Sequence, residues 1–362
     1  MVSAAIFYFL VSLITGILAE LSVRANKNMR KAIACLSVIV PATFAGLRYG
    51  IGTDYFVTYK PYYDYLAGNG SLLLVNRDSL DFGYYLLNVL VIKLGGNFQL
   101  VLFLASVITI YALRKAILPY KEKISLGLAT FVFMLMYYQA SFNIVRQMMA
   151  ATIVLYAFQF IIKHEPKHFV FWVFIAALFH KTAIIVLPFY LFSNVVTKKR
   201  YKLLIVAFYV VFFYAVFNFD RFTGLLNYID SSGYYSNYLR KVSSFSFSVG
   251  LLIRTVPYIV SVLLMWKRIK DDRILGVFLN SFLLGSILRL IVYMTQFDAD
   301  RIALYFLMPQ VIFIPYLTKY YKKSWRDFCG VAILLGTTIL LWYFDFIYMG
   351  RNATVPYTTI FN

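Results

Sequence analysis

Acidic residues are scarce in this sequence: Asp and Glu together number 15, against 35 Lys and Arg. The four charged residue types make up 14% of the chain, whereas a soluble globular domain contains about 25%. This shortage of charge excludes an ordinary soluble domain. Cysteine is scarce as well, because only Cys35 and Cys329 are present and both lie in or beside apolar runs. A disulfide framework is therefore excluded, and no zinc site is indicated.

Apolar and aromatic side chains dominate instead, at 62% and 19% of the residues. Apolar runs of about 15 to 20 residues, which is the length of a membrane-spanning helix, follow one another along most of the chain. We therefore predict an all-α, polytopic integral membrane protein in which residues 1–362 form a single transmembrane domain of about 12 helices. The predicted spans are 3–22, 32–47, 97–113, 124–140, 144–162, 168–180, 181–196, 202–219, 249–267, 274–294, 301–318 and 327–347.

Three of the apolar segments need a separate interpretation. Segment 82–95 is predicted to be a short re-entrant or interfacial helix, because a full crossing there would place the basic loop 114–123 outside. Segments 168–180 and 181–196 are short for full spans. They are either two spans or one span broken between them.

The net charge of +20 would suit a nucleic-acid-binding protein, but the basic residues form short clusters between the apolar runs. Membrane proteins retain their cytoplasmic loops in this way, so no nucleic-acid partner is expected. The basic clusters fall on one side of the predicted topology, which is then cytoplasmic. Both termini and the two long loops 48–81 and 220–248 are predicted to be external. The first apolar run has no basic start, so we interpret it as a retained helix and not a cleaved signal.

Unusual polar residues gather on the external side of this topology. The first group follows the second span in RYGIGTDYFVTY, where Arg48 and Asp54 flank two glycines that permit a tight turn. Such a turn can place a catalytic base near an anionic substrate, and an ordinary interfacial loop with an Arg–Asp pair is the alternative. Tyr55, with Tyr59 and Tyr62, either contacts sugar rings or anchors the membrane boundary.

The second group lies in SFNIVRQMMA, where Asn143, Arg146 and Gln147 have the i, i+3, i+4 spacing of one helical face. An Arg inside a spanning helix costs about 2.5 kcal/mol or more at its centre, so it usually pairs or lines a wet cavity. We predict that the three residues bind substrate. A snorkelling Arg146 held by a carboxylate is the alternative.

The third group is the pair His180 and Lys181 in ALFHKTAIIVLP, which interrupts an apolar stretch. A lone histidine there is more often a structural hydrogen-bonding group, but the adjacent lysine is consistent with a polar chamber. His180 is therefore a candidate catalytic residue and Lys181 a candidate ligand of the substrate.

The fourth group is TQFDADRIALYF, where Asp298, Asp300 and Arg301 stand at the outer start of a predicted helix. The helix dipole favours carboxylates there, so capping is one explanation. Substrate binding by Asp300 and Arg301 is the other. A divalent cation usually takes more oxygen ligands than two aspartates supply, so no metal is predicted.

Arg254 and Arg289 complete the candidate substrate-binding set, because both lie within predicted spans, where a cation is costly. Several arginines that meet in one external cavity would suit a phosphate or a diphosphate. The guanidinium fork binds phosphate oxygens in pairs.

Taken in order, RYGIGTDY, DFGYYLL, NIVRQMMA, FHKTAIIVLPFY and DADRIALYF resemble the EpsG family over residues 44–306. That family comprises bacterial membrane proteins of exopolysaccharide and capsule clusters, related to Wzy-type polysaccharide polymerases and grouped with the GT-C glycosyltransferases. The positions that match its motifs are Arg48, Gly52, Thr53, Asp54, Tyr55, Asn143, Arg146, Gln147, His180, Lys181 and Arg301.

The resemblance implies a GT-C-like enzyme of the bacterial cytoplasmic membrane. It would join oligosaccharide repeat units at the outer face, with donor and acceptor both carried on undecaprenyl diphosphate. No cofactor or nucleotide sugar is needed for that reaction. Besides the lipid-linked donor and acceptor, candidate partners are membrane lipids and the flippase and chain-length regulator of the same pathway.

The resulting hypothesis is a metal-independent glycosyl transfer in which Asp54 removes the proton of the acceptor hydroxyl. Arg146 and Arg254, helped by Arg48 and Arg301, bind the substrate and stabilise the departing lipid diphosphate. His180 is the alternative base. The catalytic carboxylate of GT-C enzymes usually follows the first helix, whereas Asp54 follows the second. A flippase or transporter for the same lipid, an O-antigen ligase-type transferase and an acyltransferase are the alternative functions.

Overall fold

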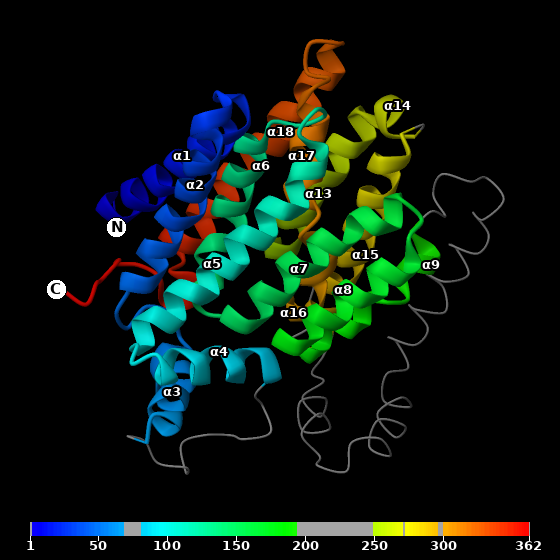
Figure 1. The fold of residues 1–362 in the computed structure, drawn as a ribbon. Coiled ribbons are helices and arrows are strands. Elements are labelled where there is room, and N and C mark those ends of the chain that lie inside the picture. Colours follow the sequence, from blue (N-terminus) through cyan, green and yellow to red (C-terminus); the bar gives the residue numbers. More distant parts are fainter. Residues whose placement is uncertain (1, 69–80, 194–248, 271, 296–299, 362) are drawn as a thin grey trace.

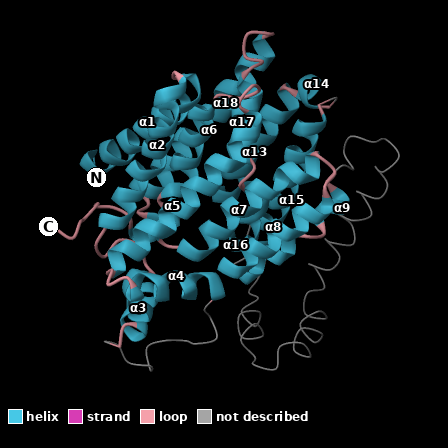
Figure 2. Ribbon diagram, viewed as in Figure 1, coloured by secondary structure: helices cyan, strands magenta, loops and turns pink. Residues whose placement is uncertain are grey.

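The computed structural model describes residues 2–68, 81–193, 249–270, 272–295 and 300–361, and its regular elements there are helices (Figures 1 and 2). This confirms the all-α prediction for the described part of the chain. The α-helices are α1 (Val2–Arg24), α2 (Lys27–Leu47), α3 (Lys60–Leu66), α4 (Phe82–Lys93), α5 (Phe98–Ile117), α6 (Leu126–Phe133), α7 (Val145–Ile162), α8 (Pro166–Phe179), α9 (Phe189–Phe192), α13 (Val249–Leu264), α14 (Trp266–Ile269), α15 (Arg273–Thr295), α16 (Asp300–Leu307), α17 (Gln310–Thr318) and α18 (Trp325–Trp342). Short 3₁₀ or π segments are η1 (Tyr55–Tyr59), η4 (Leu118–Tyr120), η5 (Met134–Tyr138), η6 (Ala140–Phe142), η7 (Lys181–Val186), η9 (Tyr343–Tyr348) and η10 (Arg351–Ala353).

Six helical segments of the described chain are long and apolar enough to cross a membrane, so the protein is a multi-pass membrane protein. Each of the six falls on a predicted span. Other predicted spans hold shorter apolar helices, and segment 202–219 and loop 220–248 lie outside the described residues, so the count of twelve stays a prediction. The six segments are Val2–Arg24, Lys27–Leu47, Phe98–Tyr120, Val145–Ile162, Arg301–Thr318 and Trp325–Tyr348.

Helix α1 shows how the surface is adapted to lipid. Its exposed face carries large apolar side chains, among them Ile6, Leu10 and Ile17, while Ser12 and Thr15 are buried against the protein. The two buried hydroxyls donate to backbone carbonyls one turn earlier. This is the reverse of a soluble amphipathic helix, and small or weakly polar residues at helix contacts are typical of membrane bundles.

Helix α7 forms the centre of the bundle and is buried along almost its whole length. Helices α5 and α8 pack on it directly, and the hairpin of α1 and α2 adds a further layer beyond α5 (Figure 1). Helices α13 and α18 pack together, as do α15 and α16. Helix α7 also contacts α15 and α16, so it lies where the N-terminal and C-terminal halves of the chain meet.

Helix α4 corresponds to the segment predicted to be re-entrant or interfacial. Its 12 residues extend about 18 Å at 1.5 Å per residue, which is too short to cross a hydrocarbon core of about 30 Å. It lies across the end of the bundle near α3 (Figure 1). Asp81 stands at its N-cap position.

The chain reverses direction at His180, which has an extended backbone conformation (φ −159°, ψ 110°) directly after α8. The segment that follows returns along α8, since the rings of Phe169 and Tyr190 lie 5.4 Å apart. A single span broken between 168–180 and 181–196 is therefore wrong. The two segments form a hairpin with His180 at its turn.

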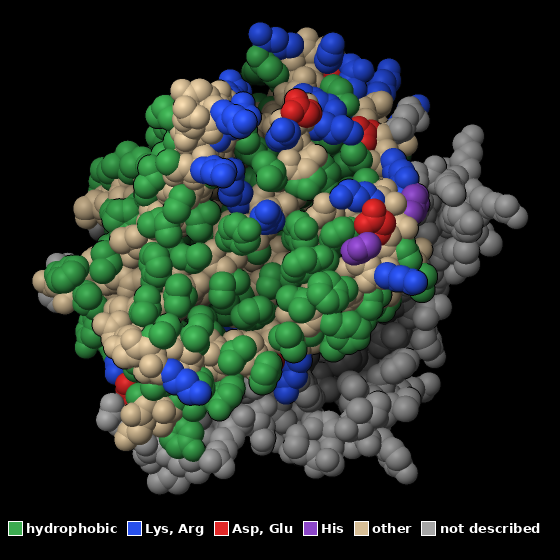
Figure 3. Space-filling model, viewed as in Figure 1, with side chains coloured by type: hydrophobic (Ala, Val, Ile, Leu, Met, Phe, Trp, Pro, Cys, Tyr) green, Lys and Arg blue, Asp and Glu red, His purple; other side chains and the backbone are tan. Residues whose placement is uncertain are grey.

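Lysine and arginine side chains gather at the end of the molecule formed by the α1–α2 turn, α14 and the connection from α17 to α18 (Figure 3). Helices α3, α4 and α16 lie toward the opposite end (Figure 1). The asymmetry has the form expected from the clustered basic loops. Which end faces the cytoplasm stays a prediction.

Candidate functional site

Asn143 holds the glycine-rich turn that follows α2. Its Oδ1 accepts hydrogen bonds from the Thr53 hydroxyl and from the Asp54 backbone N–H, the latter at 2.9 Å. Its Nδ2 lies 3.5 Å from Oδ1 of Asn352, near the other end of the chain. Asp54 is thus fixed beside the entry to α7.

Gly52 allows the turn to approach the residues before α7. Its φ of +100° is unfavourable for residues with a side chain, and a Cβ atom there would lie 2.8 Å from the Phe142 carbonyl oxygen. The Gly52 N–H donates to the Ala353 carbonyl at 3.2 Å. The Tyr49 N–H likewise donates to the Thr358 carbonyl at 3.0 Å. The C-terminal segment therefore closes over the turn.

Arg48, predicted to contact substrate, is buried at the end of α2. Its guanidinium donates to the carbonyls of Ala45 and Phe142 and lies 4.7 Å from the centre of the Phe142 ring. These contacts join α2 to the segment before α7. The placement assigns Arg48 to holding the turn.

Tyr55, Tyr59 and Tyr62 are core residues, with exposed fractions of 1%, 3% and 5%. The Tyr55 hydroxyl accepts from Gln99 Nε2 at 3.1 Å, and its ring packs edge-on against Phe98. Burial raises the pKa of Tyr62 to about 12, so its phenol is neutral at physiological pH. Neither sugar contact nor boundary anchoring matches this burial, because both require an exposed ring.

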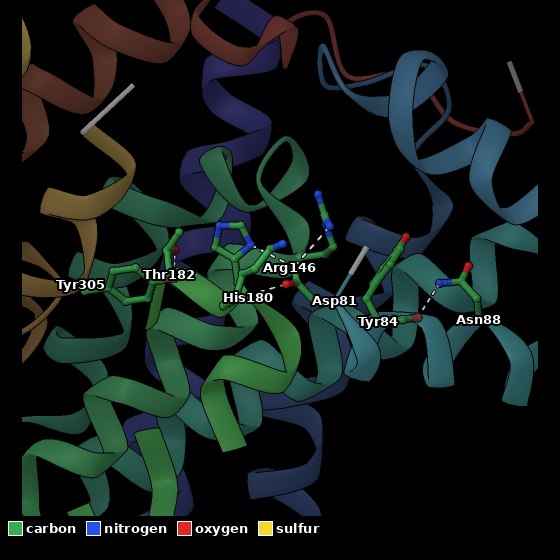
Figure 4. A network of polar contacts seen from close by, with 8 residues as sticks. Asp81, Tyr84, Asn88, Arg146, His180, Thr182 and Tyr305 are labelled. Atoms are coloured by element: carbon green, nitrogen blue, oxygen red, sulfur yellow. Dashed lines mark hydrogen bonds and ion pairs between the residues drawn. The ribbon is translucent and has the colours of Figure 1, made fainter. Parts of the chain in front are cut away.

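Asp81 is the centre of a second polar cluster (Figure 4). Its Oδ2 lies 3.2 Å from Arg146 Nη1 and 3.1 Å from His180 Nδ1. Its Oδ1 accepts from the Lys181 backbone N–H at 3.1 Å. One buried carboxylate thus joins the start of α4, the first turn of α7 and the hairpin turn after α8.

The expected common helical face of Asn143, Arg146 and Gln147 is wrong, because α7 begins at Val145 and Asn143 lies before it. Ile144 has non-helical angles (φ −99°, ψ 52°), which turn Asn143 away from the other two. Arg146 contacts Asp81, while Gln147 Nε2 donates to the Arg301 carbonyl oxygen.

Helix α16 is fixed between these elements. The Gln147 bond ties its first turn to α7, and the Thr182 and Tyr305 hydroxyls, 2.9 Å apart, tie it to η7. Arg301 and Leu304 line a cavity beside the helix. Asp298 lies outside the described residues, and only the backbone of Asp300 is described.

The cavity has a volume of about 310 Å³ and draws its charge from four arginines and one carboxylate. Asn143 and Asn352 also line it, which brings the glycine-rich turn to its edge. The described walls otherwise include apolar side chains such as Leu135, Ile144 and Phe346. The charged lining residues are Arg254, Arg289, Arg301, Arg351 and Asp345.

Asp345 balances part of this charge. Arg254 donates to both of its oxygens, and Arg351 Nε lies 3.6 Å from Oδ1. Among the described lining residues, the formal charges of four arginines and one carboxylate add up to +3. Within the described ranges, no three His, Cys, Asp or Glu side chains gather closely enough to hold a metal ion.

A sequence model of the EpsG family matches residues 31–359, most of the chain. The chain belongs to the EpsG family. This EpsG-family assignment confirms the resemblance seen in the motifs and links the protein to exopolysaccharide biosynthesis. No curated protein and no solved structure matches the sequence significantly.

Sequence reasoning missed several site residues of this EpsG-family protein. Asp81 opens the DFGYYLL motif, yet it was not assigned a role. Asp345 is the one acid in the apolar run WYFDFIY, and an acid within a spanning segment indicates a functional or paired residue. Arg351 and Asn352 carry no such local signal, since only the fold brings them to the cavity.

Proposed function

We propose that this protein is a GT-C-like polysaccharide polymerase. It would join undecaprenyl-diphosphate-linked oligosaccharide repeat units at the outer face of the bacterial cytoplasmic membrane, for an exopolysaccharide or a capsule. The observation that carries the proposal is the cavity lined by Arg254, Arg289, Arg301 and Arg351. Family membership supports it, because the family is linked to exopolysaccharide biosynthesis.

The cavity suits a lipid diphosphate in both charge and polarity. A diphosphate diester carries about two negative charges at neutral pH, and the arginines among the described lining residues can pair with them. Arginine binds phosphate oxygens through two parallel N–H donors, and exclusion of water strengthens these contacts. The apolar wall around Leu135, Ile144 and Phe346 suits the isoprenoid part of the carrier.

The proposed reaction forms one bond and breaks one. The acceptor hydroxyl oxygen attacks the anomeric carbon of the donor while a base takes the hydroxyl proton. The bond from that carbon to the diphosphate oxygen breaks, and the electron pair leaves with the lipid diphosphate. Arg254, Arg289 and Arg301 stabilise the developing negative charge, and one such donor is worth about 3 kcal/mol. Asp54 and His180 are the two candidate bases.

The test uses purified protein and a defined undecaprenyl-diphosphate-linked repeat unit. Arg289→Gln and Arg301→Gln are each expected to lower the rate of chain elongation about 100-fold. Arg326→Gln is the control, because Arg326 is an exposed arginine in the first turn of α18, and it should retain the wild-type rate.

Other products would assign other functions. Movement of the intact lipid across a vesicle without elongation would identify a flippase. Transfer of the glycan to an acceptor without the lipid diphosphate would identify a ligase, and acylation of the sugar would identify an acyltransferase. Elongation at the wild-type rate in both arginine variants would reject the proposed diphosphate site.

A further inference from the structure

We propose that Asp81 is a positioning residue that keeps the proton of His180 on Nδ1. Nε2 is then the basic atom that takes the proton of the acceptor hydroxyl. The inference rests on the proposed function, because it names the base of that same reaction. It selects His180 over Asp54 as the base. It also gives a role to Asp81, to which the sequence motifs assigned none.

The tautomer follows from the chemistry of the contact. Asp81 Oδ2 lies 3.1 Å from His180 Nδ1, within hydrogen-bonding distance. An ionised carboxylate has acceptors only, so the proton between the two atoms belongs to Nδ1. The other ring nitrogen of a neutral imidazole is then an acceptor and can take a proton.

The carboxylate is held firmly enough to orient the ring. The Asp81 side chain is 3% exposed. Arg146 Nη1 from α7 shares Oδ2 at 3.2 Å, and the Lys181 N–H occupies Oδ1 at 3.1 Å. Donors from two elements therefore fix the plane of the carboxylate before the imidazole binds it. An orienting group of this kind completes a catalytic base in many enzymes.

His180 retains access to a substrate. Its side chain is 18% exposed, whereas the carboxylate below it is almost completely covered. Figure 4 shows the imidazole and the Arg146 guanidinium side by side above Asp81. Thr182, two residues on, contacts Tyr305 of α16, the helix that contributes Arg301 and Leu304 to the cavity. The dyad thus borders the elements that would hold the diphosphate.

The step balances without a further reactant. Nε2 accepts the hydroxyl proton as the new glycosidic bond forms, and the lipid diphosphate leaves with the electron pair of the broken bond. The imidazolium that results is stabilised by the Asp81 carboxylate. It returns its proton to solvent or to the departing diphosphate before the next cycle.

The direct test is ¹⁵N NMR of histidine-labelled protein in nanodiscs. The chain has three histidines, so His180→Gln identifies the His180 signals by difference. The wild-type ring is expected to show a protonated Nδ1 and an unprotonated Nε2. A wild-type ring with the proton on Nε2 would overturn the proposal without any need for an Asp81 variant.

Two substitutions connect the tautomer to activity. In Asp81→Asn the amide oxygen is expected to take the place of Oδ1 and accept from the Lys181 N–H, so the amide NH₂ takes the place of Oδ2. There it loses the Arg146 contact, donates to Nδ1 and moves the ring proton to Nε2. This loss of general-base catalysis should lower kcat about 100-fold or more with KM little changed. Asp81→Glu keeps a carboxylate and should restore both the Nδ1–H form and part of kcat.

A purely structural role would give a different pattern. Both Asp81 variants would then lower Tm equally, while the His180 tautomer would stay as in the wild type, and this result would overturn the inference. Asp64→Asn is the matched control, since Asp64 pairs with Lys60 on α3 at 2.7 Å and should change neither readout. A wild-type protein with the Nδ1–H form that makes no polymer would reject the proposed function and leave the positioning by Asp81 intact.

Discussion

Arg254 of α13 and Asp345 of η9, which are 91 residues apart, form an ion pair in the cavity wall, with Nε 3.3 Å from Oδ2. Their side chains are 8% and 15% exposed. A pair so far removed from water is costly to break from one side, because the remaining charge stays buried without its counter-ion. The pair therefore supports the bundle as well as setting the charge of the cavity.

Asp345→Asn is accordingly expected to lower the free energy of unfolding by about 3 kcal/mol. The measurement is an unfolding titration in mixed detergent micelles. Asp64→Asn, which breaks the more exposed Lys60 pair on α3, should cost less than about 1 kcal/mol. Equal losses in the two variants would show that Asp345 is not a buried counter-ion.

Arg48→Lys separates a structural arginine from a ligand-binding one. A lysine ammonium cannot reproduce the two carbonyl contacts and the stacking on Phe142. We expect a loss of about 2 kcal/mol in the free energy of unfolding. Arg301→Lys, at an exposed residue of the cavity lining, should leave stability unchanged while it slows elongation. If Arg48→Lys instead slowed elongation and left stability unchanged, Arg48 would be a substrate-binding residue.

Gly52→Ala tests the close approach of the turn to the chain before α7. The added Cβ would meet the Phe142 carbonyl oxygen at 2.8 Å and would require a φ of +100°. The strain is expected to lower stability by about 1 to 3 kcal/mol, seen as a lower Tm. Gly336→Ala on α18 is the control: nothing lies within 4 Å of its Cβ position, so Tm should stay or rise. An unchanged Tm for Gly52→Ala would mean that the turn does not approach the Phe142 carbonyl this closely.

Asn143→Ala removes the acceptor that holds both Thr53 and the Asp54 N–H. We expect faster protease cleavage between residues 48 and 59 and at least about a tenfold loss of elongation, because a loosened turn misplaces the cavity edge. Asn26→Ser, which retains the cap of α2, serves as control. Wild-type cleavage and activity in Asn143→Ala would show that the turn is held by other contacts.

The membrane helices were accessible to sequence reasoning because apolar length is a local property. All six long spans fall where the apolar runs placed them. The chain reversal at His180 could be predicted only in part. The pattern marked a break there, but the reversal depends on contacts such as Phe169 with Tyr190, which no local pattern encodes.

The residues of the candidate site likewise divide into those that could be predicted from the sequence and those that could not. Arg254 and Arg289 were noticed because a cation in an apolar run is unusual, and Arg301 because it stands with two aspartates at the start of a predicted helix. All three line the cavity. Asp345, the acidic partner of Arg254, and Asp81 were missed, because the significance of a carboxylate depends on its distant neighbours. Arg146 and His180 reach Asp81 across 65 and 99 residues. Tyr55 was misjudged because a tyrosine in a loop is usually exposed, whereas here it fills the core.

The contacts of the glycine-rich turn determine when during synthesis the turn can reach its final structure. Tyr49 and Thr358 bond to each other although 309 residues separate them, and Gly52 depends in the same way on Ala353. A ribosome releases the first partner long before the second. The edge of the cavity therefore takes its final shape only after α18 has inserted, and a prematurely terminated chain would lack the contacts that hold the glycine-rich turn.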